Sequence, residues 1–200
     1  PDRRLDAFRT FTLREAAGPD DTELLENEPT KDIGTVTGFF EYNSLILHIG
    51  DELVTFSGAT KEAPWKFTGV SRGALGTKAA AHKKGTAARQ LKECFGLLVP
   101  DVESTLFEEI ARNHAEVVNQ CDFDGIYLDA IDGSSILRGP DECWYWADKF
   151  VMEIQRHLKK PAGMEMSAMW HHFWQYRTRW QAWDYPRRGY KRFIDIHAET

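Results

Sequence analysis

Three carboxylates lie at or just after the ends of short apolar segments in the second half of the chain. Asp129 and Asp132 follow the run that begins at Phe123, and Glu165 lies in the next apolar run. Apolar residues followed by acids are typical of buried parallel strands that carry polar side chains at the rim of a sheet. Hydrolysis of a glycosidic bond needs two carboxyl groups. These acids therefore predict a carbohydrate-cleaving site.

The acids can be given roles from their positions. We expect Asp129 to be the nucleophile or transition-state stabiliser, with Glu165 or Asp132 as the acid/base. Asp129 and Asp132 share one loop, and two close carboxylates do not both ionise easily, which suits one of them as an acid. A close partner of this kind favours retention of configuration. The alternative for Asp132 is a turn residue before Gly133, and Asp124 is interpreted as structural.

Other side chains near these acids are candidates for holding a sugar. Six of the seven tryptophans lie between Trp144 and Trp183, and an aromatic ring offers a flat apolar surface for the face of a pyranose. Core packing is the alternative and explains about half of the tryptophans. The candidate substrate-binding residues are Tyr127, Trp170, His171, His172, Arg177, His197 and Glu199.

Two of these candidates suggest further roles. The guanidinium of Arg177 suits the carboxylate or sulfate of an acidic sugar, and a salt bridge to Asp184 or to one of the strand-end acids is an equal alternative. Glu199 is the reserve candidate for the acid/base.

The adjacent histidines His171 and His172 raise the alternative of a metal-dependent hydrolase or lyase. Neighbouring side chains on a helix point in different directions, and no third ligand has the spacing of a zinc site. The three cysteines show no CxxC spacing. We therefore expect no metal and no cofactor.

The elements that must position these residues fall into two patterns. Alternating apolar residues and turn signals predict a small β-rich module over 36–92, with a hairpin formed by 45–49 and 52–56. Strands and helices then alternate over 93–200, which predicts a parallel sheet. The expected strands are 94–99, 123–129, 161–167 and 193–197, and the expected helices are 105–120 and 141–158. Residues 1–35 are polar and predict an irregular segment.

The stretch from Asp124 to Asp132 resembles the strand of (β/α)8-barrel glycoside hydrolases that carries a catalytic aspartate. The resemblance implies an α/β fold of the TIM-barrel type, with Asp129 as the strand-end acid. Four strands are too few for a closed barrel, which takes about 250 residues. We therefore expect part of a barrel, preceded or interrupted by the β-rich module. The remaining strands would come from a missing segment or another chain.

The β-rich module resembles a small β module of phage-tail and surface proteins and of some carbohydrate-active enzymes. The resemblance rests on Ile49-Gly50-Asp51-Glu52 followed by Arg72-Gly73, Gly76-Thr77, His82 and Gly85. Its glycines suit tight turns with positive φ. We expect Arg72 and His82 to stabilise these turns rather than to bind a ligand.

The net charge and the apolar content of the chain exclude some classes of binding partner. The formal net charge is −6, which argues against nucleic acid because binding to phosphates needs a concentrated basic surface. No apolar run is long enough to span a membrane. The leading hypothesis is a glycoside hydrolase of polysaccharides or oligosaccharides, acidic ones included. The alternative is a non-catalytic carbohydrate-binding or surface/tail structural protein. A secreted or periplasmic location is expected.

Overall fold

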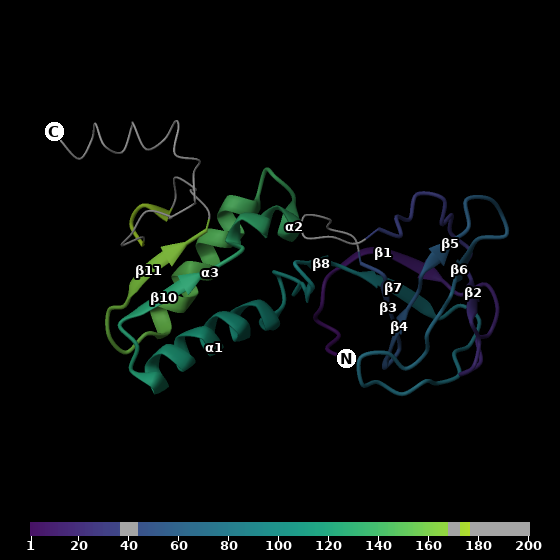
Figure 1. The fold of residues 1–200 in the computed structure, drawn as a ribbon, viewed down its shortest axis with the longest axis horizontal. Coiled ribbons are helices and arrows are strands. Elements are labelled where there is room, and N and C mark those ends of the chain that lie inside the picture. The colour runs from purple at the N-terminus through teal and green to yellow at the C-terminus, as the bar shows by residue number, and fades with distance from the viewer. Residues whose placement is uncertain (37–43, 168–172, 177–200) are drawn as a thin grey trace, which may run out of the picture.

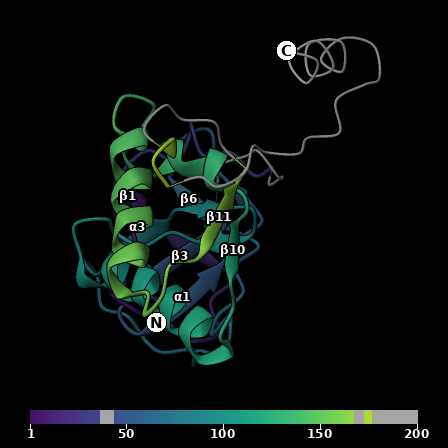
Figure 2. The same cartoon turned by 90° about the vertical axis from the view of Figure 1, so that its left-hand side faces the viewer.

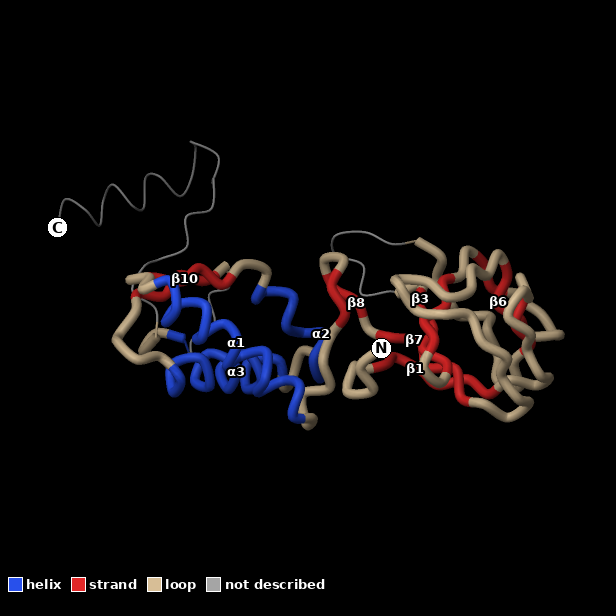
Figure 3. Tube along the Cα trace, turned by 90° about the horizontal axis from the view of Figure 1, so that it is seen from below, coloured by secondary structure: helices blue, strands red, loops and turns tan. Residues whose placement is uncertain are grey.

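The computed structural model describes residues 1–36, 44–167 and 173–176. These residues form two lobes that lie side by side along the long axis of the molecule (Figure 1). We call residues 1–36 and 44–92 the β lobe, and residues 93–167 and 173–176 the α/β lobe. Among the described residues, all the helices lie in the α/β lobe and most of the strands lie in the β lobe (Figure 3).

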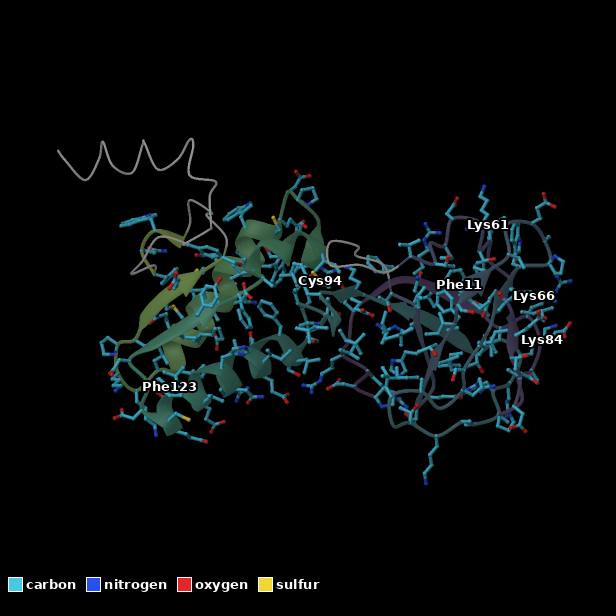
Figure 4. The ribbon with its side chains drawn as sticks, viewed as in Figure 1. Phe11, Lys61, Lys66, Lys84, Cys94 and Phe123 are labelled. Atoms are coloured by element: carbon cyan, nitrogen blue, oxygen red, sulfur yellow. The ribbon has the colours of Figure 1, made fainter. Side chains whose placement is uncertain are left out.

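Two antiparallel sheets form the β lobe. The first has the order β1 (Ala7–Thr12), β7 (Ala87–Leu91), β3 (Ile46–Ile49) and β4 (Glu52–Thr55). The second has the order β2 (Glu23–Leu25), β6 (Lys66–Thr68) and β5 (Gly58–Ala59). Side chains from both sheets meet in one buried cluster, in which the rings of Phe11 and Phe67 lie edge to face at 5.0 Å. Phe11 is visible inside this lobe in Figure 4.

The hairpin predicted over 45–56 is confirmed. β3 and β4 pair in antiparallel register from Ile46 with Thr55 to Ile49 with Glu52, and Gly50 turns the chain with φ 61°. The segment 1–35, expected to be irregular, contains β1 and β2, and β1 pairs with β7. Its apolar side chains are few, but Phe11 and Leu13 are both buried on one side of the chain, which anchors the segment to the core.

The α/β lobe begins with a short hairpin and continues as alternating helices and strands. Its elements are β8 (Glu93–Cys94), β9 (Leu97–Leu98), α1 (Thr105–Cys121), β10 (Gly125–Leu128), the 3₁₀ helix η1 (Ile131–Ser134), α2 (Ser135–Arg138), α3 (Cys143–His157) and β11 (Gly163–Met166). The helices expected at 105–120 and 141–158 are confirmed as α1 and α3. β10 and β11 form a parallel pair with α3 in the connection between them.

One face of this strand pair packs on the two long helices. Ile126 and Leu128 of β10, with Met164 and Met166 of β11, join one core cluster. The helices contribute small or β-branched side chains to that cluster, namely Ala111, Ala115, Ala147, Val151 and Ile154. Seen from below, β10 forms one layer and α1 and α3 form the other (Figure 3). The lobe is therefore a two-layer β-α-β arrangement.

The prediction of a (β/α)8-type barrel is wrong. Within the described residues, β10 and β11 are the only parallel strand pair, every other pairing is antiparallel, and no sheet closes. The segment 94–99 is not a parallel strand, because β8 and β9 fold back on each other. Phe95 and Gly96 have φ values of 54° and 77°, and two positive angles are what a tight hairpin turn requires. The strand expected at 193–197 lies outside the described residues.

Direct contacts join the two lobes. Asp6 N–H donates to Val99 O at 2.8 Å, and Lys92 Nζ donates to Ile136 O at 3.2 Å. Arg4 Nη1 forms an ion pair with Glu109 of α1 at 2.8 Å. The N-terminal strand region is thus tied to both the hairpin and the first helix of the α/β lobe.

Candidate functional site

The face of β10 and β11 that points away from the helices carries the predicted acids. Tyr127 pairs in register with Glu165, and Leu128 pairs with Met166. Side chains alternate along a strand, and the buried Leu128 and Met166 face the helices. Tyr127 and Glu165 therefore lie side by side on the opposite surface, which we call the open face. Figure 2 looks at the two strands lying next to each other.

Asp129 follows directly after β10 and is exposed. Its Oδ1 accepts a hydrogen bond from Tyr127 Oη at 3.2 Å and another from Ala130 N–H at 2.9 Å. Both bonds fall on the same oxygen, and no donor in the described part of the chain bonds to Oδ2. The two oxygens of this carboxylate are therefore bonded unequally.

A tight turn carries the chain away from Asp129. Ala130 adopts the left-handed conformation, with φ 57° and ψ 16°, and η1 begins at Ile131. Ile131 N–H donates to Ser167 Oγ at 3.0 Å, and Ser167 N–H donates to Leu128 O at 3.2 Å. Sequence reasoning did not select Ser167. The only signal for it was a hydroxyl residue at the end of the expected strand 161–167.

The structure brings together three of the predicted site residues. Tyr127, Asp129 and Glu165 lie on neighbouring strand ends, and Asp132 lies in η1 just beyond them. Tyr127 and Asp129 are exposed and Glu165 is half-buried, on one face of a two-stranded sheet and not inside a barrel. The remaining candidates lie outside the described residues, and these are Trp170, His171, His172, Arg177, His197 and Glu199.

A shallow groove runs beside the open face, between α1 and β10. Its volume is about 460 Å³, and its lining is mostly apolar, with Asn113 and His114 as polar members. Phe123, labelled in Figure 4, and Tyr127 both line it and are 50% and 55% exposed. Aromatic rings exposed to this degree beside polar groups are suited to contact with a sugar.

The β lobe holds a different carboxylate cluster around Glu52, which is fully buried. Its oxygens accept hydrogen bonds from Arg72 Nε and Nη2, at 2.9 and 2.7 Å, and from His82 Nε2, at 2.7 Å. The backbone N–H groups of Gly73 and Ala80 also donate to it. Burial by itself raises the pKa of Glu52, but these hydrogen bonds outweigh it and hold the pKa at about 2.

This cluster is structural. Both oxygens of Glu52 are occupied, and no water-facing surface remains through which a substrate could reach them. Arg72 and His82 bind the hairpin to the turns that follow it, as the sequence predicted. What sequence reasoning did not identify is that Glu52, the last residue of the predicted hairpin motif, is the acceptor for both.

In the described ranges no group of three or more His, Cys, Asp or Glu side chains is arranged to hold a metal ion. No helix there has the length and hydropathy required to cross a membrane. No protein-family model, curated protein or solved structure matches the chain. The resemblances to barrel glycoside hydrolases and to a tail-protein β module are therefore not upheld, and a function has to be inferred from the geometry of the open face.

Proposed function

We propose that the chain hydrolyses O-glycosidic bonds of a polysaccharide or oligosaccharide at the open face. The observation that carries this proposal is the parallel register of β10 and β11. It puts Tyr127 beside Glu165, with Asp129 one step beyond the strand end. The carboxyl group of Asp129 is exposed and that of Glu165 is half-buried. A pair of carboxyl groups on one surface is what glycoside hydrolysis uses.

The reaction needs one carboxylate and one carboxylic acid. Asp129 Oδ2 attacks the anomeric carbon while the bond from that carbon to the leaving oxygen breaks, and Glu165 gives its proton to the leaving oxygen. Glu165, now a carboxylate, takes a proton from water, and the resulting hydroxide displaces Asp129 from the sugar. One water is consumed, both side chains return to their starting states, and the configuration at the anomeric carbon is retained.

Tyr127 supports this chemistry in two ways. Its hydroxyl holds Asp129 Oδ1 at 3.2 Å, which orients the carboxylate. Its ring is 55% exposed and so offers a surface on which a sugar face can pack.

The test is release of reducing ends from a panel of neutral and acidic polysaccharides. Asp129→Asn and Glu165→Gln should each lower the rate at least about 1,000-fold, because each removes a group that acts on the reacting atoms. Asp124→Asn is the matched control, since Asp124 is an exposed acid that lies just before the same strand. Its Oδ1 accepts a hydrogen bond from Lys160 Nζ at 2.9 Å. This variant should leave the rate unchanged. Turnover of Asp129→Asn within a few-fold of the unaltered chain would contradict the proposal.

A non-catalytic carbohydrate-binding function is the second candidate. The exposed rings of Phe123 and Tyr127 along the groove favour it, because binding by stacking needs no carboxylate. On this alternative the chain binds a polysaccharide in affinity electrophoresis without cleaving it. Tyr127→Ala would then weaken binding, and Asp129→Asn would not.

A further inference from the structure

We infer that Ser167 is a positioning residue for Asp129, an inference that rests on the function proposed above. Ser167 lies just after β11 and is 5% exposed. Its Oγ accepts a hydrogen bond from Ile131 N–H, and its own N–H donates to Leu128 O. Ser167 therefore contacts the chain both immediately before and shortly after Asp129.

The turn between these two contacts depends on such support. Ala130 is in the left-handed region, which residues with a Cβ atom disfavour. Ile131 N–H is the first amide of η1, and first-turn amides have no acceptor within their own helix. Ala130 precedes η1 and makes no side-chain cap. Ser167 Oγ supplies the acceptor from the neighbouring strand and so stabilises the turn.

The turn at Ala130 also orients the carboxylate of Asp129. Ala130 N–H donates to Asp129 Oδ1 at 2.9 Å, so the direction of the carboxylate follows the direction of the peptide group that joins Asp129 to Ala130. When Ala130 stays left-handed, Oδ1 is held by this amide and by Tyr127, and Oδ2 is left for the sugar. Without the Ser167 hydroxyl, the turn can relax and the amide can rotate away from Oδ1. The nucleophilic oxygen then loses its fixed position.

Steady-state kinetics of the whole chain on a polysaccharide that it cleaves test this inference. Ser167→Ala should lower kcat about 10- to 100-fold with KM changed less than about two-fold, since a small misplacement of a reacting group slows the chemical step. Ser167→Thr retains the Oγ acceptor and should restore most of kcat. Ala130→Gly in the Ser167→Ala background should also recover kcat, because glycine adopts the left-handed conformation without strain.

A second measurement separates this inference from the proposed function. Hydrogen exchange at the Ile131 amide should accelerate at least about 10-fold in Ser167→Ala and return in Ser167→Thr, whether or not the chain is an enzyme. A normal kcat in Ser167→Ala would overturn the positioning role. So would a low kcat in both Ser167→Thr and the Ser167→Ala, Ala130→Gly double variant. Activity in Asp129→Asn would instead overturn the proposed function, while faster exchange at Ile131 would still assign the turn contact to Ser167.

Discussion

The two lobes use carboxylates in opposite ways. Glu52 in the β lobe is fully buried, and both of its oxygens accept hydrogen bonds from charged or backbone donors. Asp129 in the α/β lobe is exposed and has donors on one oxygen alone among the described residues. The carboxylate of Glu52, with both oxygens bonded, holds the fold together, whereas the exposed carboxylate of Asp129, with donors on one oxygen, is the one that we propose as a nucleophile. Glu52 begins a strand and Asp129 follows one, so position in the sequence does not distinguish the structural acid from the exposed one.

A third acid departs from both of these cases. Glu26 in the β lobe is fully buried, and neither of its oxygens has a hydrogen-bond partner in the described part of the chain. Burial, with a smaller contribution from the charge of Glu28, raises the pKa of Glu26 to about 8. It is therefore a neutral acid at neutral pH. The β lobe thus contains one acid stabilised as an anion by its neighbours and one that stays protonated because it has none.

The largest effect on stability should come from Glu52. Glu52→Gln leaves Arg72 buried without its counter-charge, which should reduce the free energy of unfolding by about 3–5 kcal/mol. Asp129→Asn is the contrasting change and should leave the midpoint of thermal unfolding within about 2 °C, as is usual for an exposed site. Urea unfolding and thermal unfolding of both variants check these two expectations. Equal losses of stability would remove the distinction between the two acids.

The next largest effect should be the pH dependence due to Glu26. Because its pKa is raised to about 8 in the folded state, the folded chain binds a proton that the unfolded chain releases near its ordinary value of 4.5. Stability should therefore be full below pH 4.5 and fall as the pH rises through 8. One pKa unit corresponds to about 1.4 kcal/mol, so the loss is at most several kcal/mol.

Glu26→Gln tests this directly. The variant should be more stable than the unaltered chain at pH 9, and this advantage should disappear toward pH 5. Glu23→Gln, which removes an exposed acid paired with Lys66, is the control and should shift the whole curve little. Parallel curves for Glu26→Gln and the unaltered chain would show that Glu26 does not titrate in this range.

A smaller effect is expected at the hairpin where the two lobes meet. Gly96 has φ 77° and open space around its Cα, so an added Cβ meets no neighbour but strains the backbone. Gly96→Ala should cost about 1–2 kcal/mol. Thermal unfolding measures the change. An unchanged midpoint would mean that the tight turn of β8 and β9 is not needed for stability.

The smallest effect should come from the exposed acids of the α/β lobe. Lys160 forms ion pairs with Asp122 and Asp124 at 2.7 and 2.9 Å, and these contacts lower the pKa of Asp122. All three side chains are exposed, and such pairs contribute little to stability and are screened by salt. Lys160→Ala should leave the unfolding midpoint unchanged within error at 0.5 M NaCl. If Lys160→Ala lowers the unfolding midpoint even at 0.5 M NaCl, these exposed acids are structural groups, as Glu52 is.

Local pattern was enough to predict much of the secondary structure. The helical spacing of apolar residues located α1 and α3, and the turn at Gly50 located the hairpin of β3 and β4. The parallel pairing of β10 with β11 followed from the helix between them. The same pattern was wrong at 94–99, because a six-residue apolar run is compatible with one long strand or with two short ones. The left-handed angles at Phe95 and Gly96 decided between them.

The sequence by itself determined which groups are available: acids after strands, a tyrosine two residues before one of them, and a hairpin rich in turn residues. Tertiary structure alone decided the environment of each acid. An acid can be a hydrogen-bonded anion like Glu52, a buried protonated acid like Glu26 or an exposed carboxylate like Asp129. Which of these it becomes depends on its burial and on the donors that contact it, which come from residues up to 30 positions away, as His82 does for Glu52. Those donors are brought in by sheet packing, and hydrogen bonding and desolvation act over a few ångströms in space rather than along the chain.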